Sequence, residues 1–500
     1  MHHCLKILEI VDAICVHLDP PFNRVSSFRD LAAVARTCTT FSGPALDHLW
    51  KSPPLDRLLT RCMPSDLWEL ERELKPLRPI RARDWDRLRL YAPRVRILAS
   101  HDDNWLSSDA LQALSVSLPE RLFQNLKTLN WEHLDDEFHY IRLFLSSTLT
   151  SLRFALTSFP AVSLLSTLAS VCPRLTDVSI KSSGYTKEIS EFVCAIQRPE
   201  KLKLLVHLSR LQTLKSLDLN TLPSGLNMSS VQGTNTFSAL RTLRLTESDS
   251  VLTTEFLGLC SGVPLKKFGR CFDEFTTAAK MHALFIAMAA GFSHTSLEQL
   301  VLDNGCEEAA GADPAVYLIS HHSLLPLLCF TNLVILCIAS PMGFDLDDGA
   351  VSDFARALPH VETFQLTACF PTHIPPNHPR YCPRLSTLGI ALDATTVPTI
   401  DLNRSQDGGV LQLNLGCLDV EHSTVGRAMP VARFLSSVFP NLDTIYTHRE
   451  HFPNGEEEML EHGVAIGHHN RWKEVAELLF EVPAIREEGR ALERKVSGLE

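Results

Sequence analysis

The sequence lacks the features of a membrane or secreted protein. It contains no run of about 18 unbroken apolar residues, the length needed to cross a bilayer. Its N-terminus has no basic leader followed by a long apolar run, so we expect no secretory signal. The 14 cysteines are scattered singly, without a CxxC pair. Cysteines of this kind, in a chain without a signal peptide, are expected to be reduced and mostly buried. We therefore expect a cytoplasmic or nuclear protein.

Catalytic and metal-binding motifs are also missing. The sequence has no glycine-rich phosphate loop, G-x-S-x-G or H-E-x-x-H motif. The histidine pairs at 2–3, 321–322 and 468–469, and the cluster His448-Arg-Glu450-His451, lack a second ligand cluster and are interpreted as exposed loop histidines. Asp345 to Gly349 lacks the spacing of a calcium loop and is interpreted as a turn. We expect no catalytic residues, no cofactor, no metal and no enzymatic activity.

The charge and the length limit the class of partner and the architecture. A net charge of −11 argues against nucleic acid, because phosphate binding requires a basic face. The charge is uneven: the tail from Glu450 onward is acidic, and residues 72–96 are rich in arginine. A solvated surface explains such runs in most proteins, and a contact within the chain or with a partner is the alternative. The arginines of this stretch are Arg72, Arg78, Arg81, Arg83, Arg87, Arg89, Arg94 and Arg96. Five hundred residues, 45% of them hydrophobic, indicate several domains or one long repeat array with a continuous core.

The first fifty residues predict three short helices. Apolar residues recur at helical spacing from Leu8 to Leu18, and Asp19-Pro20-Pro21 ends this helix. We expect a loop that carries Ser26 and Ser27, and a second helix that begins near Asp30. A third helix is expected to begin after the break at Ser42-Gly43-Pro44 and to end on Leu49-Trp50. Three small helices form a weak core, so such a module usually needs a partner or a docked neighbour.

The order of these residues resembles the F-box family. The matching residues are Leu8, Glu9, Ile10, Ile14, Leu18, Leu31, Ala35, Cys38, Phe41, Leu49 and Trp50. The resemblance implies that these residues dock against the Skp-type adaptor of a cullin-based ubiquitin ligase. Glu9 stands where the family usually has proline, and Phe41 where it usually has tryptophan. The alternative is that the three helices only cap the end of the repeat array.

From residue 91 onward a phrase recurs, in which an aromatic residue or cysteine precedes the pattern L-x-x-L-x-L. Each phrase predicts a turn that leads into a short strand, whose alternate leucines point into the core. The copies begin their leucine pattern at Val95, Leu126, Leu149, Leu175, Leu214, Leu240, Leu297, Leu333, Val361, Leu385 and Leu442, with weaker copies at Leu265 to Phe268 and at Leu411 to Leu415. Helical stretches lie between the phrases. The alternative is a closed domain built from ordinary βα units. It is not favoured, because such units do not repeat the same aromatic or cysteine residue at a constant distance before each strand.

Most of these copies are 20–29 residues apart, the spacing of leucine-rich repeats. Other spacings are longer, notably from Leu175 to Leu214 and from Leu265 to Leu297, and are interpreted as insertions in the connecting loops. The predicted fold class is α/β: an N-terminal three-helix F-box-like module followed by a curved leucine-rich-repeat solenoid, with parallel strands on the concave face and helices outside. The predicted domains are the F-box-like module (1–52), a helical linker (53–90), the solenoid (91–450), and a C-terminal helical cap with an acidic tail (451–500). The stripe from Trp472 to Phe480 is expected to dock on the last repeat.

The concave face is the default partner surface of a solenoid. The residues predicted to face the target are Thr128, Asn130, Arg153, Asp177, Ser179, Ser216, Asp218, Thr242, Arg244, Gln299, Glu362, Gln365 and Ser386. No single charge dominates this set, which suits a protein target better than phosphate. The predicted function is therefore the substrate-recognition subunit of a cullin-type ubiquitin ligase, which binds an adaptor and a protein target but no nucleic acid and no membrane. The alternative is a scaffold or recognition protein without a ligase role.

Overall fold

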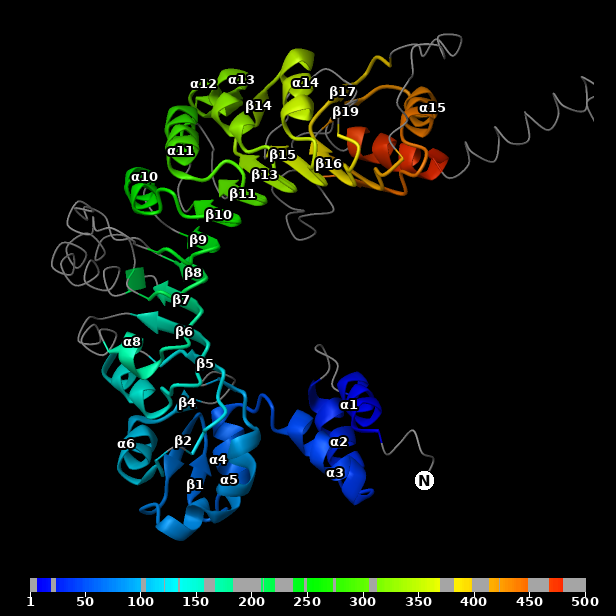
Figure 1. The fold of residues 1–500 in the computed structure, drawn as a ribbon. Helices are drawn as coiled ribbons and strands as arrows, with labels where there is room; N and C mark the ends of the chain where they lie inside the picture. Colours follow the sequence, from blue (N-terminus) through cyan, green and yellow to red (C-terminus); the bar gives the residue numbers. More distant parts are fainter. Residues whose placement is uncertain are drawn as a thin grey trace, which may run out of the picture. The chain divides into compact units, whose positions relative to one another are not determined.

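The computed structural model divides into two compact units (Figure 1). The first unit comprises residues 1–221 and 225–239, and the second comprises residues 222–224 and 240–500. The structure describes residues 7–18, 24–99, 105–120, 122–133, 135–156, 167–182, 208–209, 211–220, 237–246, 250–272, 276–304, 313–368, 382–397, 413–421, 423–447 and 467–479. In these residues, no helix is long and apolar enough to cross a membrane.

The first unit begins with three helices, α1 (Leu8–His17), α2 (Arg24–Ala35) and α3 (Thr39–Leu49). Two predicted boundaries were wrong, because α2 begins six residues before Asp30 and α3 begins before Ser42. Pro44 lies inside α3 as its sixth residue, so it costs one internal hydrogen bond, yet Ala45 beside it is fully buried against α1 and α2. Packing of this short helix therefore outweighs the local break signal.

The rest of the first unit consists of short strands, helices and turns. Its elements are α4 (Leu55–Cys62), β1 (Trp68–Leu70), β2 (Glu73–Pro76), η2 (Ala82–Trp85), α5 (Asp86–Tyr91), η3 (Ala92–Arg94), β3 (Ile97–Ala99), β4 (Trp105–Leu106), α6 (Ser108–Ser117), β5 (Thr128–Trp131), η4 (Asp135–Leu143), β6 (Ser151–Leu156), α8 (Leu168–Val171), β7 (Asp177–Ser182) and β8 (Ser216–Leu219). The stretch predicted as a helical linker also contains the antiparallel pair β1–β2, which β4 extends in parallel. Strands β3, β5, β6, β7 and β8 pair in parallel, in chain order.

The second unit continues the same alternation. Its elements are β9 (Thr242–Thr246), α10 (Ser250–Leu259), β10 (Lys267–Phe272), α11 (Ala278–Gly291), β11 (Gln299–Asn304), α12 (Pro314–Tyr317), β12 (Ile319–Ser320), α13 (His321–Leu324), η6 (Leu325–Cys329), β13 (Ile335–Ser340), β14 (Phe344–Asp345), α14 (Asp348–Ala357), β15 (Thr363–Ala368), β16 (Thr387–Ile390), β17 (Asp393–Ala394), β18 (Cys417–Glu421), β19 (Thr424–Val425), α15 (Ala428–Val438) and β20 (Thr444–Thr447). Strands β9, β10, β11, β13, β15, β16, β18 and β20 pair in parallel, in chain order. Helices α10, α11 and α14 lie on one side of these strands (Figure 1).

Within each unit, each repeat is joined to the previous one by the same pair of backbone hydrogen bonds. The carbonyl just before one strand accepts two N–H groups at the start of the next strand, so both of its lone pairs are used. In the first unit, Lys127 N and Thr128 N donate to Arg96 O at 2.8 and 3.0 Å. In the second unit, Val334 N and Ile335 N donate to Glu298 O in the same way. This recurrence, together with parallel strands in chain order, agrees with the predicted α/β repeat fold.

Asparagines at one position of the phrase add a second bond between repeats. Asn332 Nδ2 donates to Thr295 O at 2.7 Å, and Asn441 Nδ2 donates to Leu413 O at the same distance. Asn125 and Asn414 make equivalent bonds. The leucine pattern did not identify these asparagines, because each asparagine lies one residue before the first leucine of its phrase. Their shared position is the signal that could have identified them.

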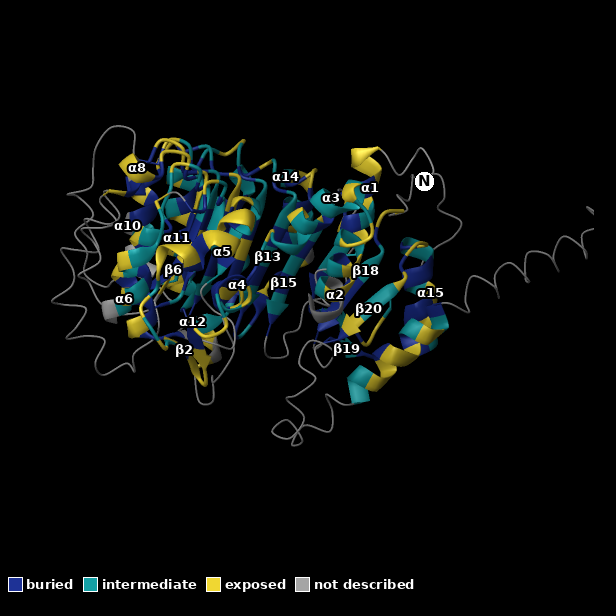
Figure 2. Ribbon diagram, turned by 90° about the horizontal axis from the view of Figure 1, so that it is seen from below, coloured by how far each residue is buried: buried dark blue, intermediate teal, exposed yellow. Residues whose placement is uncertain are grey.

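Alternating burial forms the core of both units. In β13, for example, Leu336 and Ile338 are buried and their neighbours are half-buried (Figure 2). In the weak copy at Leu411–Leu415, the described residues Leu413 and Leu415 precede the strand rather than form it, since β18 begins at Cys417. The long spacing after Leu265 is not a simple loop, because the 14-residue helix α11 occupies it.

The C-terminal part of the second unit ends in a helix over residues 467–479. Its buried residues are Trp472, Val475 and Leu479. Trp472 Nε1 donates to Ser423 O at 2.9 Å, and Arg471 Nη1 donates to Val425 O at 3.2 Å. The helix therefore packs beside β18 and β19. Phe480, the acidic segment at 456–458 and the last residues lie outside the described residues.

Candidate functional site

Helix α1 carries both buried and exposed apolar side chains. Val11 and Cys15 are fully buried in a cluster with Leu31 and Ala45. Other large apolar side chains, on α1 and at the residue before it, are exposed, and exposed segments of α1 are yellow in Figure 2. These side chains are Ile7 (47%), Leu8 (63%), Ile10 (38%) and Val16 (52%). Four exposed large apolar side chains within ten residues, beside the exposed Glu9 and Asp12, form a candidate docking surface.

The residues predicted to contact an adaptor divide into an exposed and an internal group. Leu8, Glu9 and Ile10 are exposed, and Ile14 is half-buried. Leu31 is fully buried, because it packs between the three helices, so its side chain belongs to the core of the module rather than to a contact surface. The half-buried residues that pack against this core are Leu18, Ala35, Phe41 and Leu49. Cys38 is half-buried at the N-terminal end of α3.

The end of α3 is attached to the segment that precedes β3. The Trp50 ring stacks on Tyr91, with centroids 4.7 Å apart. Arg94 Nη1 donates to Gly43 O at 3.2 Å and also contacts the Asp47 carboxylate. The predicted contact residue Trp50 therefore has an internal partner. Since Lys51 O accepts Arg96 N and Ile97 N at 2.9 Å, the repeated backbone bond begins directly after the helices.

In the first unit, the strand residues predicted to face a target lie in two parallel rows. One row, in register, is Asn130, Arg153, Ser179 and Asp218. The adjacent row is Thr128, Ser151, Asp177 and Ser216. All eight are exposed or half-buried, while the residues that alternate with them are buried. Ser179 Oγ donates to Asp218 Oδ2 at 3.2 Å, so part of this polar surface is fixed by its own hydrogen bonds.

In the second unit, the face between β9 and β20 is less charged. The row that contains Arg244 and Gln365 continues through Gly269, Val301, Cys337, Gly389, Asp419 and Tyr446. The neighbouring row contains Thr242, Lys267, Gln299, Ile335, Thr363, Thr387, Cys417 and Thr444. Two predicted residues were misplaced: Glu362 and Ser386 lie one residue before their strands, in the turn.

Apolar members of this face were not predicted. Val301 is 39% exposed, and Ile335 and Cys337 are half-buried beside it. The alternation rule would have identified Val301, which lies between two buried leucines in β11. The Cys337 thiol lies 3.2 Å from Gln365 Oε1, and burial raises its pKa to about 11, so it stays protonated at neutral pH. The centre of this face therefore offers uncharged contacts.

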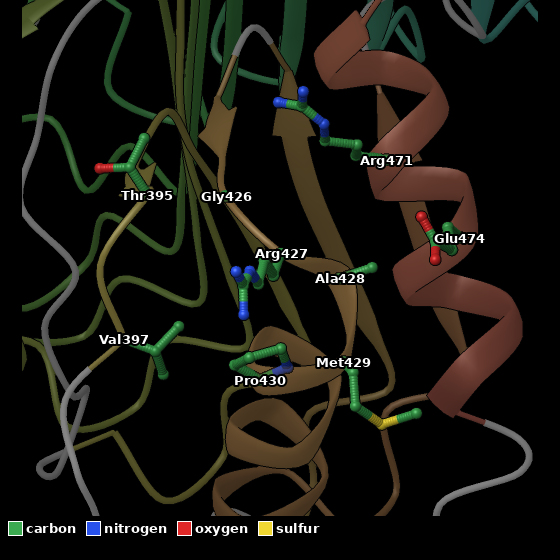
Figure 3. A pocket seen from close by; sticks show the side chains of 9 residues that line it. All are labelled: Thr395, Val397, Gly426, Arg427, Ala428, Met429, Pro430, Arg471 and Glu474. Carbon is green, nitrogen blue, oxygen red and sulfur yellow. The ribbon is translucent and has the colours of Figure 1, made fainter.

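A cavity of about 780 Å³ lies in the second unit, between the start of α15, the loop after β17 and the C-terminal helix (Figure 3). The lining residues are Thr395, Val397, Gly426, Arg427, Ala428, Met429, Pro430, Arg471 and Glu474. A Cβ at Gly426 would lie 2.6 Å from Thr395 O, so glycine is required for this close approach. The lining supplies hydroxyl, guanidinium and carboxylate groups, which bind polar ligands but do not form a nucleophile–base pair. Three segments that are distant in the sequence form this cavity, and no sequence pattern predicts it.

Near the end of the same sheet, Glu421 is a buried carboxyl group. Burial raises its pKa to about 8, with a smaller contribution from the buried Asp419. Its Oε2 accepts Ala368 N at 2.7 Å, and its backbone has a φ of 46°, which is unusual for a residue other than glycine. Glu421 therefore fixes the end of β18 to the end of β15, a structural role.

Histidines that sequence analysis assigned to exposed loops are partly engaged in packing. His468 Nδ1 lies 3.0 Å from Val425 N, and His469 Nδ1 lies 2.7 Å from Thr447 Oγ1. The pair at 2–3 and the cluster at 448–451 lie outside the described residues. Within the described part of the chain, no group of three histidine, cysteine or acidic side chains could hold a metal ion. Asp347 is not simply a turn residue, because its Oδ1 accepts Ala350 N at 2.8 Å and caps α14.

Comparison with known proteins does not assign a family. No family model matches the sequence. No curated protein matches it either. One solved structure that is similar is the "Crystal structure of Rad7 and Elc1 complex in yeast", with 14% sequence identity and a TM-score of 0.32. The match covers 61% of this chain and 78% of that chain. A likeness at this level supports no conclusion about fold or function.

Proposed function

We propose that this chain is a substrate-recognition subunit of a cullin-type ubiquitin ligase. Helix α1 binds a Skp-type adaptor, and the exposed rows of the parallel strands bind a protein target. The observation that carries the proposal is the set of exposed apolar side chains on α1, which the small core of α1, α2 and α3 leaves uncovered. Burying exposed leucine and isoleucine side chains is worth about 1.5–3 kcal/mol each, so this surface is sufficient to anchor a partner.

The strand faces support the second half of the proposal. Their rows are polar and mixed in charge in the first unit, and largely uncharged at the centre of the second. Protein interfaces combine an uncharged centre with a polar rim, whereas phosphate polymers require dense positive charge. A protein target therefore fits these faces better than nucleic acid.

Binding of the purified full-length chain to a Skp-type adaptor tests the proposal. The double substitution Leu8→Glu and Ile10→Glu is expected to weaken adaptor binding at least about 100-fold, because both side chains would lie in the dry centre of the interface. Val116→Glu is the matched control, since Val116 is an 85% exposed apolar residue on α6. Isothermal titration calorimetry measures both effects. A full-length chain that does not bind the adaptor would exclude the ligase role.

A second candidate is a scaffold in which the three helices only cap the repeats. The contacts of Trp50 with Tyr91 and of Arg94 with Gly43 favour it, because they are the contacts a cap would make. In that case the α1 double variant should lose no partner, and partner capture should depend on the strand faces alone. Affinity capture with the full-length chain and with the α1 variant separates the two functions.

A further inference from the structure

The structure divides the arginine-rich stretch into paired and unpaired side chains. The paired side chains are Arg78 (with Asp66 and Asp84), Arg89 (with Asp86) and Arg94 (with Asp47). Arg78 holds Asp66 at 2.9 Å and Asp84 at 2.7 Å, and its guanidinium lowers the pKa of both carboxyl groups. These three arginines therefore have an internal structural role.

Four other arginines, two within this stretch and two on α4 before it, lack such a role. Arg57 and Arg61 lie one turn apart on α4, and Arg83 and Arg87 lie four residues apart across η2 and α5. All four are exposed, and none of these guanidinium groups makes an ion pair or hydrogen bond within the described part of the chain. We call these four residues the arginine face.

The two halves of the arginine face are adjacent. Helix α4 packs against α5, and Figures 1 and 2 both show the two helices side by side. The charge of Arg87 also acts on the Cys62 thiol at the end of α4, where it opposes the increase in pKa that burial causes. Arg87 is therefore close to the turn that carries Arg61.

Neighbouring carboxylates do not neutralise this face. Asp56 on α4 is only 4% exposed, and Asp86 on α5 is engaged by Arg89 at 3.3 Å. Like charges one helical turn apart destabilise a helix, so the fold gains nothing from this arrangement. An external anionic partner would relieve the repulsion.

We propose that the arginine face binds an acidic segment of a partner protein. Leu90, three residues after Arg87 on α5, is 70% exposed and supplies an apolar contact beside the charges. A partner segment that combines glutamate or aspartate with an apolar side chain matches both. This inference is independent of adaptor binding through α1.

Nucleic acid matches the face less well. Single strands bind to grooves whose aromatic side chains stack on the bases, and in the described part of the first unit the exposed large apolar side chains are all aliphatic. Phosphate polymers would also be repelled by the net charge of −11. An acidic protein segment presents its charges locally and can use Leu90 as well.

The test uses the full-length chain and a fluorescein-labelled peptide of glutamate and leucine, measured by fluorescence anisotropy. Arg61→Glu with Arg87→Glu is expected to weaken peptide binding at least about tenfold. Arg174→Glu with Lys215→Glu is the matched control, because it changes the net charge equally at exposed positions of the same unit. The control is expected to bind within about twofold of the unchanged chain. Circular dichroism verifies that both variants are folded.

Two further probes make the result decisive. A peptide with glutamine in place of glutamate is expected not to bind, and Leu90→Ser is expected to weaken binding of the acidic peptide. The proposal is overturned if the acidic peptide does not bind, if both charge-reversal pairs weaken binding equally, or if a single-stranded oligonucleotide of the same charge binds more tightly than the peptide.

Discussion

The N-terminal helices and the strand repeats bury their apolar residues in different ways. In the strands, nearly every large apolar side chain that points into the core is buried, and within each unit a repeated pair of backbone hydrogen bonds joins each repeat to the next. In the helices, a core of four fully buried residues coexists with exposed apolar side chains on α1. The repeats therefore stabilise themselves through their neighbours, whereas the helices leave a surface that a partner can complete.

The largest effect is expected from the core of the repeats. Leu336→Ala in β13 removes a fully buried side chain and should lower the free energy of unfolding by about 2–5 kcal/mol. Val301→Ala on the exposed side of β11 should change it by less than about 0.5 kcal/mol. Urea denaturation compares the two. Equal losses at both positions would mean that the two sides of the strands are not distinct.

The next effect concerns the buried Glu421. Because its pKa in the folded protein is raised to about 8 from 4.5, its contribution to stability is complete below about pH 4.5 and is lost as the pH rises through 8. The free energy of unfolding of the unchanged chain should therefore decrease over this window relative to Glu421→Gln, by up to a few kcal/mol. Denaturation at a series of pH values measures the difference. If the free energies of unfolding of the unchanged chain and of Glu421→Gln had the same pH dependence, ionisation of Glu421 would not destabilise the folded protein, and the prediction would be wrong.

The smallest effect is expected at the asparagine bonds between repeats. Asn332→Ala removes the bond to Thr295 O at an exposed position, and should destabilise the second unit by about 0.5–1.5 kcal/mol. The control is Gln112→Ala, which replaces an exposed amide side chain on α6. The amide of Asn304 is not a suitable control, because that side chain is buried. Thermal denaturation of both variants tests whether these bonds contribute to the contact between repeats.

The strands could be predicted from the sequence because each phrase contains both its turn and its strand. The leucine before the strand and the alternating residues within it place β5, β9 and β15 directly. The phrase before β18 failed, because Leu413 and Leu415 imitate the alternation of a strand, whereas β18 begins only at Cys417. The pattern is reliable where the opening aromatic or cysteine residue is present.

The helix boundaries and the candidate surfaces were harder to predict. Gly43 and Pro44 indicate a break, yet packing of Ala45 keeps them inside α3. Spacing alone could not separate Leu31, which is buried, from Leu8, which is exposed, since both fit the same family pattern. The cavity near Arg427 was beyond prediction, because its lining comes from segments that only the tertiary fold brings together.

Hydrogen exchange of the full-length chain, with and without a Skp-type adaptor, tests the central claim most directly. If α1 is the adaptor surface, peptides that cover Leu8–His17 should exchange more slowly in the complex, while the strands β13 and β15 should be unchanged. Absence of protection in α1 in the presence of saturating adaptor, or protection confined to the strands, would contradict the proposed function.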